Sequence, residues 1–313
     1  MSVKRFGGIA AVAVIACGVG YIVAQSQVNS AAEESVRKMA DKIEANADNG
    51  LKIDFKSVDA PIFGDNISVI GVTLNDKDGN PVFGMESVGV AAEGFVENEK
   101  FPTFADFSIS EFEVVNEQVK AELNQGGLGY GDRTLDVAFG YDFDKDADTL
   151  TSYSSMSVPK MSDTSASLTV SGVAGIWDVM EANYAENEGK IDLEYKERRN
   201  IQQMFRDIRV NDEEVIYENN GEIEQVVETV AAEEGLSVEQ VNTRLPDMID
   251  FYAGGSPFAG ELKKFVADPV KLSVALNPAE PIAPAEFFQR FMMASMGNTE
   301  KALDGFGLEV KAN

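Results

Sequence analysis

Apolar residues divide the chain into an uninterrupted apolar run, a short helical stripe and a series of alternating segments. Uncharged, largely apolar residues fill positions 6–24. Nineteen helical residues at 1.5 Å each span roughly 28 Å, close to the hydrocarbon thickness of a bilayer. Lys4 and Arg5 precede this run, and the first charge after it is Glu33. The asymmetry predicts a signal-anchor transmembrane helix with a cytoplasmic N-terminus and a translocated body.

Two other fates of the apolar run stay open beside the retained anchor. Ala24-Gln25-Ser26 is compatible with removal of a secretory signal. Val14-Ile15-Ala16-Cys17 resembles a bacterial lipobox, but the apolar run continues beyond Cys17, where a lipoprotein turns polar. We expect a single-pass anchor over residues 1–25. Its apolar side chains are Phe6, Ile9, Val12, Val14, Ile15, Val19, Tyr21, Ile22 and Val23.

Residues 26–48 follow the anchor with the period of a helix. The apolar positions are Val28, Ala32, Val36, Met39 and Ile43. Their spacings of four, four, three and four place them on one helical face, and charged residues fill the other faces. This predicts an amphipathic stalk helix packed on the body, with a dimerisation seam as the alternative.

From residue 49 the apolar period changes to two, which predicts β-strands. Asp76-Lys77-Asp78-Gly79-Asn80 has the Asp-Gly chemistry of a hairpin turn, and a break in phase between Ile109 and Phe112 indicates a β-bulge. Short strands joined by tight polar turns favour an antiparallel meander over a parallel α/β sheet. The expected strands are 51–55, 66–74, 81–92, 107–114, 135–143, 150–158 and 165–173.

Beyond Val173 the pattern turns helical. An apolar stripe of Ile223, Val226, Val227, Val230 and Ala231 predicts a helix that Gly235 ends. Ser237 is the expected N-cap of the next helix. Further helices are expected from Ser256-Pro257 and after Pro284, with strands at 270–276 and 306–310.

These elements combine into an α+β fold. We expect a curved antiparallel β-meander partly covered by helices, preceded by the transmembrane helix and the stalk helix. Residues 49–313 form one body, because no change of composition or flexible linker separates the sheet half from the helical half. A split into two domains near residue 175 is the alternative.

The charge of the chain excludes several partners. It carries 53 acidic and 26 basic residues, a formal charge of −27. Such a chain is not expected to bind nucleic acid, which needs clustered Lys and Arg, and the same balance argues against docking of the body on anionic lipid. The composition fits a soluble, acidic, exported body.

The chain has no histidine, and its only cysteine is Cys17 in the apolar run. Ser-His-Asp and Cys-His catalysis are therefore impossible, as is a zinc site built on His and Cys. Carboxylate acid–base chemistry, Ser-Lys dyads and oxygen-ligand cation sites survive. We predict no catalytic residue and no cofactor, and a carboxylate-based hydrolase is our third hypothesis, with candidates Glu186, Glu188, Asp212, Glu213 and Glu214.

Two acidic loops have the alternating carboxylates of a calcium site. They contain Asp142, Asp144, Asp146 and Asp148, and Asp76, Asp78 and Asn80. Calcium needs six to eight oxygen ligands, and the helix-loop-helix motif needs glycine at its sixth position and glutamate at its twelfth. Counting from Asp144, those positions hold Thr149 and Ser155. Solvated hairpin tips are the expected state of both loops.

Aromatic and methionine residues supply a candidate apolar groove. Phe139 and Phe143 belong to the most regular alternation in the chain, and residues 287–296 are rich in Phe and Met. Such side chains are common in cores, and they also line surfaces that bind a lipid chain or a partner helix. The groove candidates are Phe139, Phe143, Phe287, Phe288, Phe291 and Met292.

The first half of the chain resembles a family of bacterial envelope proteins. The signal-anchor and short helix precede FKSVDAPIFGDNISVIGVTLNDKDGNPVFGMESVGV, residues 55–90. This combination is similar to the opening of AsmA-like and YdgA-like proteins, in which a strand and a Gly-Pro hairpin begin a long curved antiparallel sheet. Ser110–Val114 and Leu168–Val173 are similar to their later strands. The likeness covers about residues 1–175, and residues 175–260 depart from it.

The resemblance implies a protein of the bacterial inner membrane, single-pass, with a periplasmic body that handles lipid or maintains the envelope. Our leading hypothesis is a non-enzymatic body whose sheet concavity binds an acyl chain or a protein partner. The alternative is an adaptor or structural subunit of an envelope complex.

Overall fold

The structure, a computed structural model, describes residues 33–34, 36–38, 40–41, 44, 50–59, 66–92, 102–187, 193–253, 258–295 and 306–313. The predicted anchor at 6–24 lies outside these residues. Within the part that is described, no helix is both long and apolar enough to cross a bilayer.

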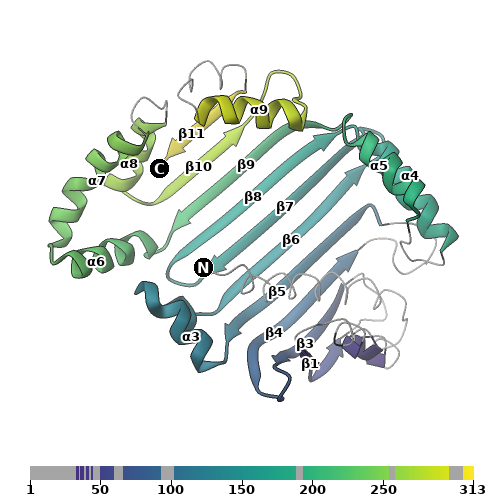
Figure 1. Cartoon of the computed structure of the whole chain (residues 1–313), viewed down its shortest axis with the longest axis horizontal. Coiled ribbons are helices and arrows are strands. Elements are labelled where there is room, and N and C mark those ends of the chain that lie inside the picture. The colour runs from purple at the N-terminus through teal and green to yellow at the C-terminus, as the bar shows by residue number, and fades with distance from the viewer. Residues whose placement is uncertain are drawn as a thin grey trace. The chain divides into compact units, whose positions relative to one another are not determined.

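The strands form an open antiparallel sheet of eleven strands in the order β1-β3-β4-β5-β6-β7-β8-β9-β10-β11, with β2 also paired to β3 (Figure 1). This confirms the α+β class and the meander. The chain divides into two compact units, one with the described residues of 1–142 and 178–193, the other with 143–177 and those of 194–313.

The first unit contains the expected early strands and one helix that the pattern did not predict. Its elements are β1 (Lys52–Asp54), β2 (Ser57–Asp59), β3 (Asn66–Asn75), β4 (Pro81–Ala92), β5 (Phe104–Val114), α3 (Glu117–Leu123), the 3₁₀ turns η3 (Asn124–Gly126) and η4 (Tyr130–Asp132), and β6 (Leu135–Asp144). The expected bulge is present, because the β5–β6 register shifts between Ile109 and Phe112 and Glu111 has a φ of 50°.

One face of these strands carries the core of the first unit. Val69 pairs with Val88, and Val88 pairs with Ile109, so their side chains share that face. All three are buried. Val36 and Ala40, in the helical part of the expected stalk, belong to the same buried cluster. Val36 and Ala40 therefore pack on the sheet through one apolar face.

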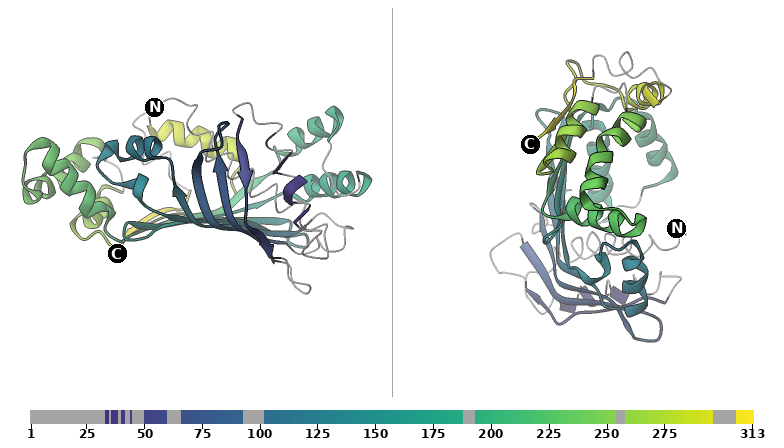
Figure 2. Two further views of the ribbon diagram at one scale, coloured as in Figure 1. Left: turned by 90° about the horizontal axis from the view of Figure 1, so that it is seen from below. Right: turned by 90° about the vertical axis from the view of Figure 1, so that its left-hand side faces the viewer.

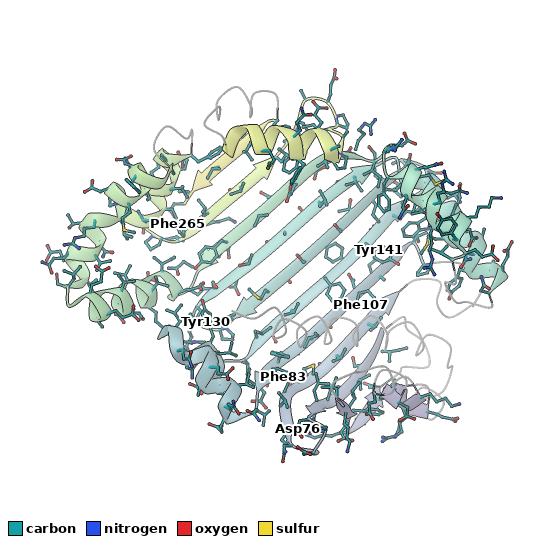
Figure 3. All side chains as sticks on the ribbon, in the orientation of Figure 1. Asp76, Phe83, Phe107, Tyr130, Tyr141 and Phe265 are labelled. Carbon is teal, nitrogen blue, oxygen red and sulfur yellow. The ribbon has the colours of Figure 1, made fainter. Side chains whose placement is uncertain are left out.

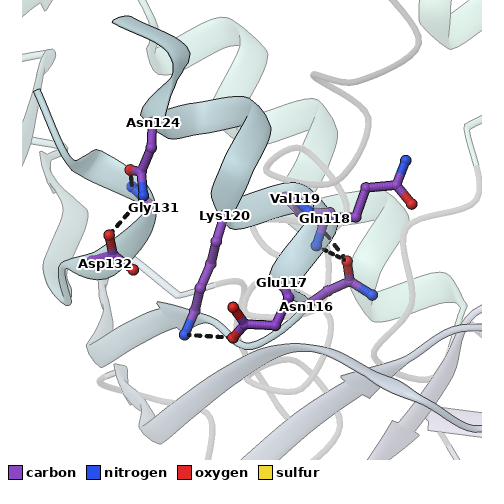
Figure 4. Close-up of polar contacts among 8 residues, drawn as sticks. All are labelled: Asn116, Glu117, Gln118, Val119, Lys120, Asn124, Gly131 and Asp132. Carbon is purple, nitrogen blue, oxygen red and sulfur yellow. Dashed lines mark hydrogen bonds and ion pairs between the residues drawn. The ribbon is translucent and has the colours of Figure 1, made fainter. Parts of the chain in front are cut away.

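The helix α3 exists because Asn116 caps it. The Asn116 side chain accepts hydrogen bonds from the backbone N–H groups of Gln118 and Val119 at 3.0 and 3.1 Å (Figure 4). Such a cap satisfies donors that a helix start leaves unpaired. The glycine-rich segment after α3 is held by Asn124, which accepts from Gly131 N and donates to Asp132. The segment therefore forms an ordered pair of 3₁₀ turns.

The second unit contains the remaining elements. They are β7 (Thr149–Val158), β8 (Ser162–Ser171), α5 (Tyr195–Met204), β9 (Arg209–Asn219), α6 (Glu222–Glu234), α7 (Val238–Ala253), α8 (Ala259–Ala267), β10 (Lys271–Leu276), α9 (Pro284–Ser295) and β11 (Leu308–Ala312), while α4 (Ala174–Glu186) crosses the division. Figure 2 shows α6, α7 and α8 on one side of the strands of this unit.

Several helix boundaries follow the sequence signals. Val227 and Ala231 of the α6 stripe are buried, and Gly235 ends α6 in the left-handed conformation. The Ser237 hydroxyl accepts from Gln240 N while the Gln240 side chain accepts from Ser237 N, a reciprocal cap at the start of α7. The expected continuous helical region is wrong at one point, because β9 lies inside it and pairs with both β8 and β10.

Candidate functional site

Strands β9, β10 and β11 bring apolar side chains together on one face of the sheet. Val274 lies directly between Val215 and Val310 in the antiparallel register. Leu276 pairs with Leu308 in the same way. Because opposed residues of a sheet point to the same face, these five side chains form one apolar surface.

The helices α8 and α9 supply aromatic side chains on the same face. Phe265 of α8 meets Tyr217 of β9 edge to face, with ring centroids 5.9 Å apart. Phe287 of α9 packs on Phe306 at 5.6 Å. Figure 1 shows α9 beside β10 and β11, and Figure 3 shows Phe265 beside the same strands.

The strands and helices enclose an apolar cleft of about 390 Å³, within the range typical of ligand pockets. Ten of its eleven lining residues are apolar, and the other is Glu213. The lining residues are Glu213, Val215, Phe258, Leu262, Leu272, Val274, Leu276, Phe287, Phe306, Leu308 and Val310. An apolar surface of this extent favours a hydrocarbon ligand, because each buried CH₂ group contributes about 0.8 kcal/mol.

A carboxylate outside the cleft ties α8 to the last strand. Glu261 accepts a hydrogen bond from the backbone N–H of Ala312 at 3.1 Å and pairs with Lys264 at 2.6 Å. The hydrogen bond from Lys264, and then that from Ala312, lower the pKa of Glu261. The Glu261 contacts hold one wall of the cleft against the β11 edge.

The predicted groove residues of α9 divide between the cleft and solvent. Phe287 lines the cleft. Phe288 and Met292 are 63% and 44% exposed. The side chain of Phe291 lies outside the described part of the molecule. One helix therefore presents an apolar face inward and a second apolar pair outward.

The two predicted groove residues of β6 have different environments. The Phe139 ring stacks on Phe107 of β5 with centroids 4.8 Å apart, on the core-bearing face of the first unit. The Phe143 ring is buried and stacks on Trp177 at 4.3 Å. Phe143 is thus a core residue that packs against α4, and it does not line an open groove.

Tyr141 lies between them on β6. Its hydroxyl donates to the Pro102 carbonyl at 3.2 Å. Burial, and then the neighbouring Tyr184, raise the pKa of Tyr141 to about 12. Figure 3 shows Tyr141 and Phe107 on neighbouring strands.

The acidic loop between β6 and β7 uses its carboxylates for backbone hydrogen bonds. Asp144 accepts from the N–H groups of Asp146 and Ala147, each at 2.9 Å. Asp148 accepts from Val173 and Ala174 at the start of α4, which makes it a helix cap. Asp142 is an exposed strand residue. These turns explain the acidic pattern without a metal.

The second acidic loop is a hairpin tip of the same kind. Asp76 accepts hydrogen bonds from the backbone of Asp78 and Asn80 and from the Asn80 side chain, and Figure 3 shows it at the β3–β4 turn. The Asn80 contacts lower the pKa of Asp76. Among the described residues, no group of three or more Asp, Glu or Cys is arranged to hold a metal ion.

The candidate catalytic carboxylates do not converge. Asp212 and Glu214 lie on the opposite side of β9 from Glu213, because neighbouring strand residues alternate in direction. Glu188 lies outside the described residues, and Glu186 ends α4. Asp106 has one buried oxygen without a hydrogen-bond partner in the described residues, and burial raises its pKa. A single carboxyl does not make an acid–base pair.

Of the eleven residues that line the cleft, Phe287 was predicted as a groove residue and the other ten were not. Phe258, Leu262 and Phe306 reach it from α8 and from the turn before β11. The available signal was the matched alternation of 272–276 and 308–310, which indicates two neighbouring strands with one apolar face. No signal in the sequence indicates that α8 and α9 cover these two strands.

The fold and the cleft define an α+β protein with an open antiparallel sheet and an apolar site beside its last strands. Residues 155–313, 159 in all, match a protein-family model described as "Uncharacterized protein". Since this is just over half of the 313 residues, the chain belongs to that uncharacterized family. The match contains every residue that lines the cleft. A search of curated proteins finds no match.

Proposed function

We propose that this protein is a non-enzymatic binding protein that holds the acyl chain of a lipid in the β9–β11 cleft. The nearly complete apolar lining of the cleft carries this proposal. The position of Val274 supports it further, because this cleft residue is an exposed valine in the middle of β10. Apolar area that is still open to water gains most from a hydrocarbon ligand.

The cellular setting is part of the same proposal. The apolar run at 6–24 supports an inner-membrane anchor with the body in the periplasm. The likeness to AsmA-like and YdgA-like proteins supports a curved sheet and a role in lipid handling. An anchored body would meet its lipid at the bilayer that holds it.

Photo-crosslinking in proteoliposomes tests the proposal with the full chain. The probe is a phosphatidylcholine with a diazirine in its acyl chain, and mass spectrometry locates the adducts. We expect adducts on the cleft-lining segments of α8, β10 and β11. The variant Val274→Glu places a charge among apolar side chains and should reduce these adducts at least tenfold, since burying an unpaired charge is strongly unfavourable.

Ser273→Glu is the matched control. It puts the same charge one residue earlier in β10, on the other face, where its cross-strand neighbour is Lys311. Its adduct yield should equal that of the unmodified chain. Adducts confined to residues 6–24, or equal loss in both variants, would contradict acyl-chain binding in the cleft.

Exposed apolar side chains favour an adaptor as the second candidate. Met248 and Phe251 are exposed and lie three residues apart on α7, as Phe288 and Met292 lie four apart on α9. Pairs at these spacings share a helical face and can dock on a partner protein. An adaptor without lipid binding would give no cleft adducts in the same experiment.

A further inference from the structure

The helix α5 and the turn after it reverse the charge of the rest of the protein. Residues 194–209 contain five basic residues and three acidic residues, a formal charge of +2, in a chain of −27. The basic residues are Lys196, Arg198, Arg199, Arg206 and Arg209. The total charge of the chain, which disfavours contact with anionic lipid, therefore does not describe the charge of this helix.

The helix α5 has a partly buried inner face and an exposed outer face. Ile201 and Met204 are partly buried, and the Met204 sulfur lies 3.6 Å from where a Cβ of Gly175 would lie at the start of α4. Tyr195 and Arg199 are four residues apart on the opposite face and are exposed. Gln202 continues that face one turn later.

Two exposed aromatic rings stand at the two ends of this helix. Tyr195 is 82% exposed at the first turn, and Phe205 is 55% exposed at the last. Phe205 is held in place, because its N–H donates to the Ile201 carbonyl at 3.1 Å. Ten helical residues span about 15 Å, so the two rings stand at opposite ends of the helix.

Three exposed cations lie on α5 and the turn after it, beside these rings. Lys196, Arg199 and Arg206 are exposed and make no ion pair with any carboxylate in the described residues. Several other surface cations pair with carboxylates, as Lys263 does with Asp250 and Lys271 with Glu218. These three exposed cations, together with Tyr195 and Phe205, form what we call the α5 surface.

We propose that the α5 surface binds the anionic phospholipid headgroups of the bilayer that anchors the chain. Amphipathic helices at membrane interfaces combine cations, which pair with lipid phosphates, with aromatic rings at the headgroup level. Nucleic acid is a poorer occupant, because Phe205 and Tyr195 lie about 15 Å apart, too far to stack on neighbouring bases. Charges more than a Debye length of about 10 Å away are screened, so the acidic remainder does not cancel the attraction.

The test uses the full chain reconstituted in two kinds of vesicle, phosphatidylcholine alone and phosphatidylcholine with one phosphatidylglycerol in three lipids. A fluorophore is attached at Gln202→Cys, on the outer face of α5, in a Cys17→Ser background. Spin-labelled phosphatidylcholine in the vesicles quenches it on contact. A second chain labelled at Glu228→Cys, an exposed position of α6, is the control site.

We expect quenching at position 202 only in the anionic vesicles, and none at position 228 in either. Raising the salt from about 0.1 M to about 1 M should abolish it, because the Debye length falls from about 10 Å to about 3 Å. Each of Lys196→Gln, Arg199→Gln and Arg206→Gln should lower the contacting population about fivefold. Substitution by Gln at three exposed lysines elsewhere, Lys52, Lys77 and Lys160, should leave the contacting population unchanged.

Two outcomes would overturn the proposal. One is quenching that does not depend on phosphatidylglycerol, which would mean that the anchor alone brings the helix to the bilayer. The other is absence of quenching at position 202 in the anionic vesicles, and protection of the label by an acidic protein or by single-stranded DNA would then identify a different occupant. Neither outcome bears on the cleft, since the photo-crosslinking experiment reads different residues.

Discussion

A single tyrosine on β6 shows how burial changes the chemistry of a residue. Tyr141 donates its hydroxyl proton to the Pro102 carbonyl and lies near Tyr184. Because burial opposes the phenolate, the pKa of Tyr141 rises to about 12, above the ordinary value of about 10. The folded state thus holds this proton more tightly than the unfolded chain does.

The sign of the resulting pH dependence follows from this difference. The stability linked to Tyr141 is fully present below pH 10 and is lost as the pH rises through about 12. The free energy of unfolding should fall between pH 10 and about pH 12, and Tyr141→Phe should make this fall smaller by an amount of order 2 kcal/mol. Urea unfolding at a series of pH values measures it. Tyr153→Phe, at an exposed tyrosine, should leave the fall unchanged.

At the scale of an element, the β10–β11 pair depends on the residue before β11. Gly307 has a φ of 59°, and its carbonyl accepts a hydrogen bond from Asn277 N at 3.1 Å. A Cβ at Gly307 would overlap the Asn277 carbonyl group. Only glycine fits this turn, because both the conformation and the space exclude a side chain.

Gly307→Ala should lower the free energy of unfolding by about 2–4 kcal/mol, because it adds a steric overlap to the cost of a positive φ. Gly260→Ala is the control, since Gly260 is in α8 with open space around its Cβ position. This control should raise the free energy by about 0.5–1 kcal/mol. Chemical denaturation of both variants measures the difference, and equal effects would contradict the prediction.

At the scale of the whole molecule, the main physical fact is an excess of 27 negative charges. Like charges on a compact body repel each other and favour the expanded unfolded chain. Surface ion pairs such as Arg244–Glu234 and Lys38–Glu34 are exposed on both sides and contribute little. Repulsion therefore dominates the surface electrostatics.

Added salt should stabilise this protein. Raising sodium chloride from about 0.01 M to about 0.5 M shortens the Debye length from about 30 Å to below 8 Å and screens the repulsion. The urea midpoint should rise, and urea is the suitable denaturant because it is uncharged. Sucrose at matched osmolality is the control. A midpoint that falls with salt would show that attractive ion pairs dominate instead.

The strand pattern was predictable where one face alternates without interruption. The expected 81–92 strand is β4, and the Asp76–Asn80 turn joins β3 to β4. Strand β9 was missed because its phase breaks. Thr169 pairs with Asp212 while Val170 pairs with Val210, so a bulge at Asn211 reverses the alternation. Residues 209–219 therefore lack the unbroken alternation that identifies a strand.

The cleft was predictable only in part, for a different reason. Phe287 was recognised from its aromatic neighbourhood, and the apolar alternation of β10 was visible. Which residues face one another depends on pairing between segments almost a hundred positions apart, from Glu213 to Val310. Local periodicity carries no information on such pairing. The same holds for Phe143, whose burial depends on the position of Trp177.

The sequence alone determined the features that depend on composition and neighbouring residues. These are the absence of histidine chemistry, the acidic charge, the apolar run at 6–24, the hairpin turns and the α+β class. Tertiary structure decided the features that depend on distant residues meeting. Packing buried Phe143, assembled the cleft from five elements and left Lys196 and Arg199 of α5 without a carboxylate ion pair in the described residues. Burial and charge pairing are properties of the folded neighbourhood, and chain order does not specify that neighbourhood.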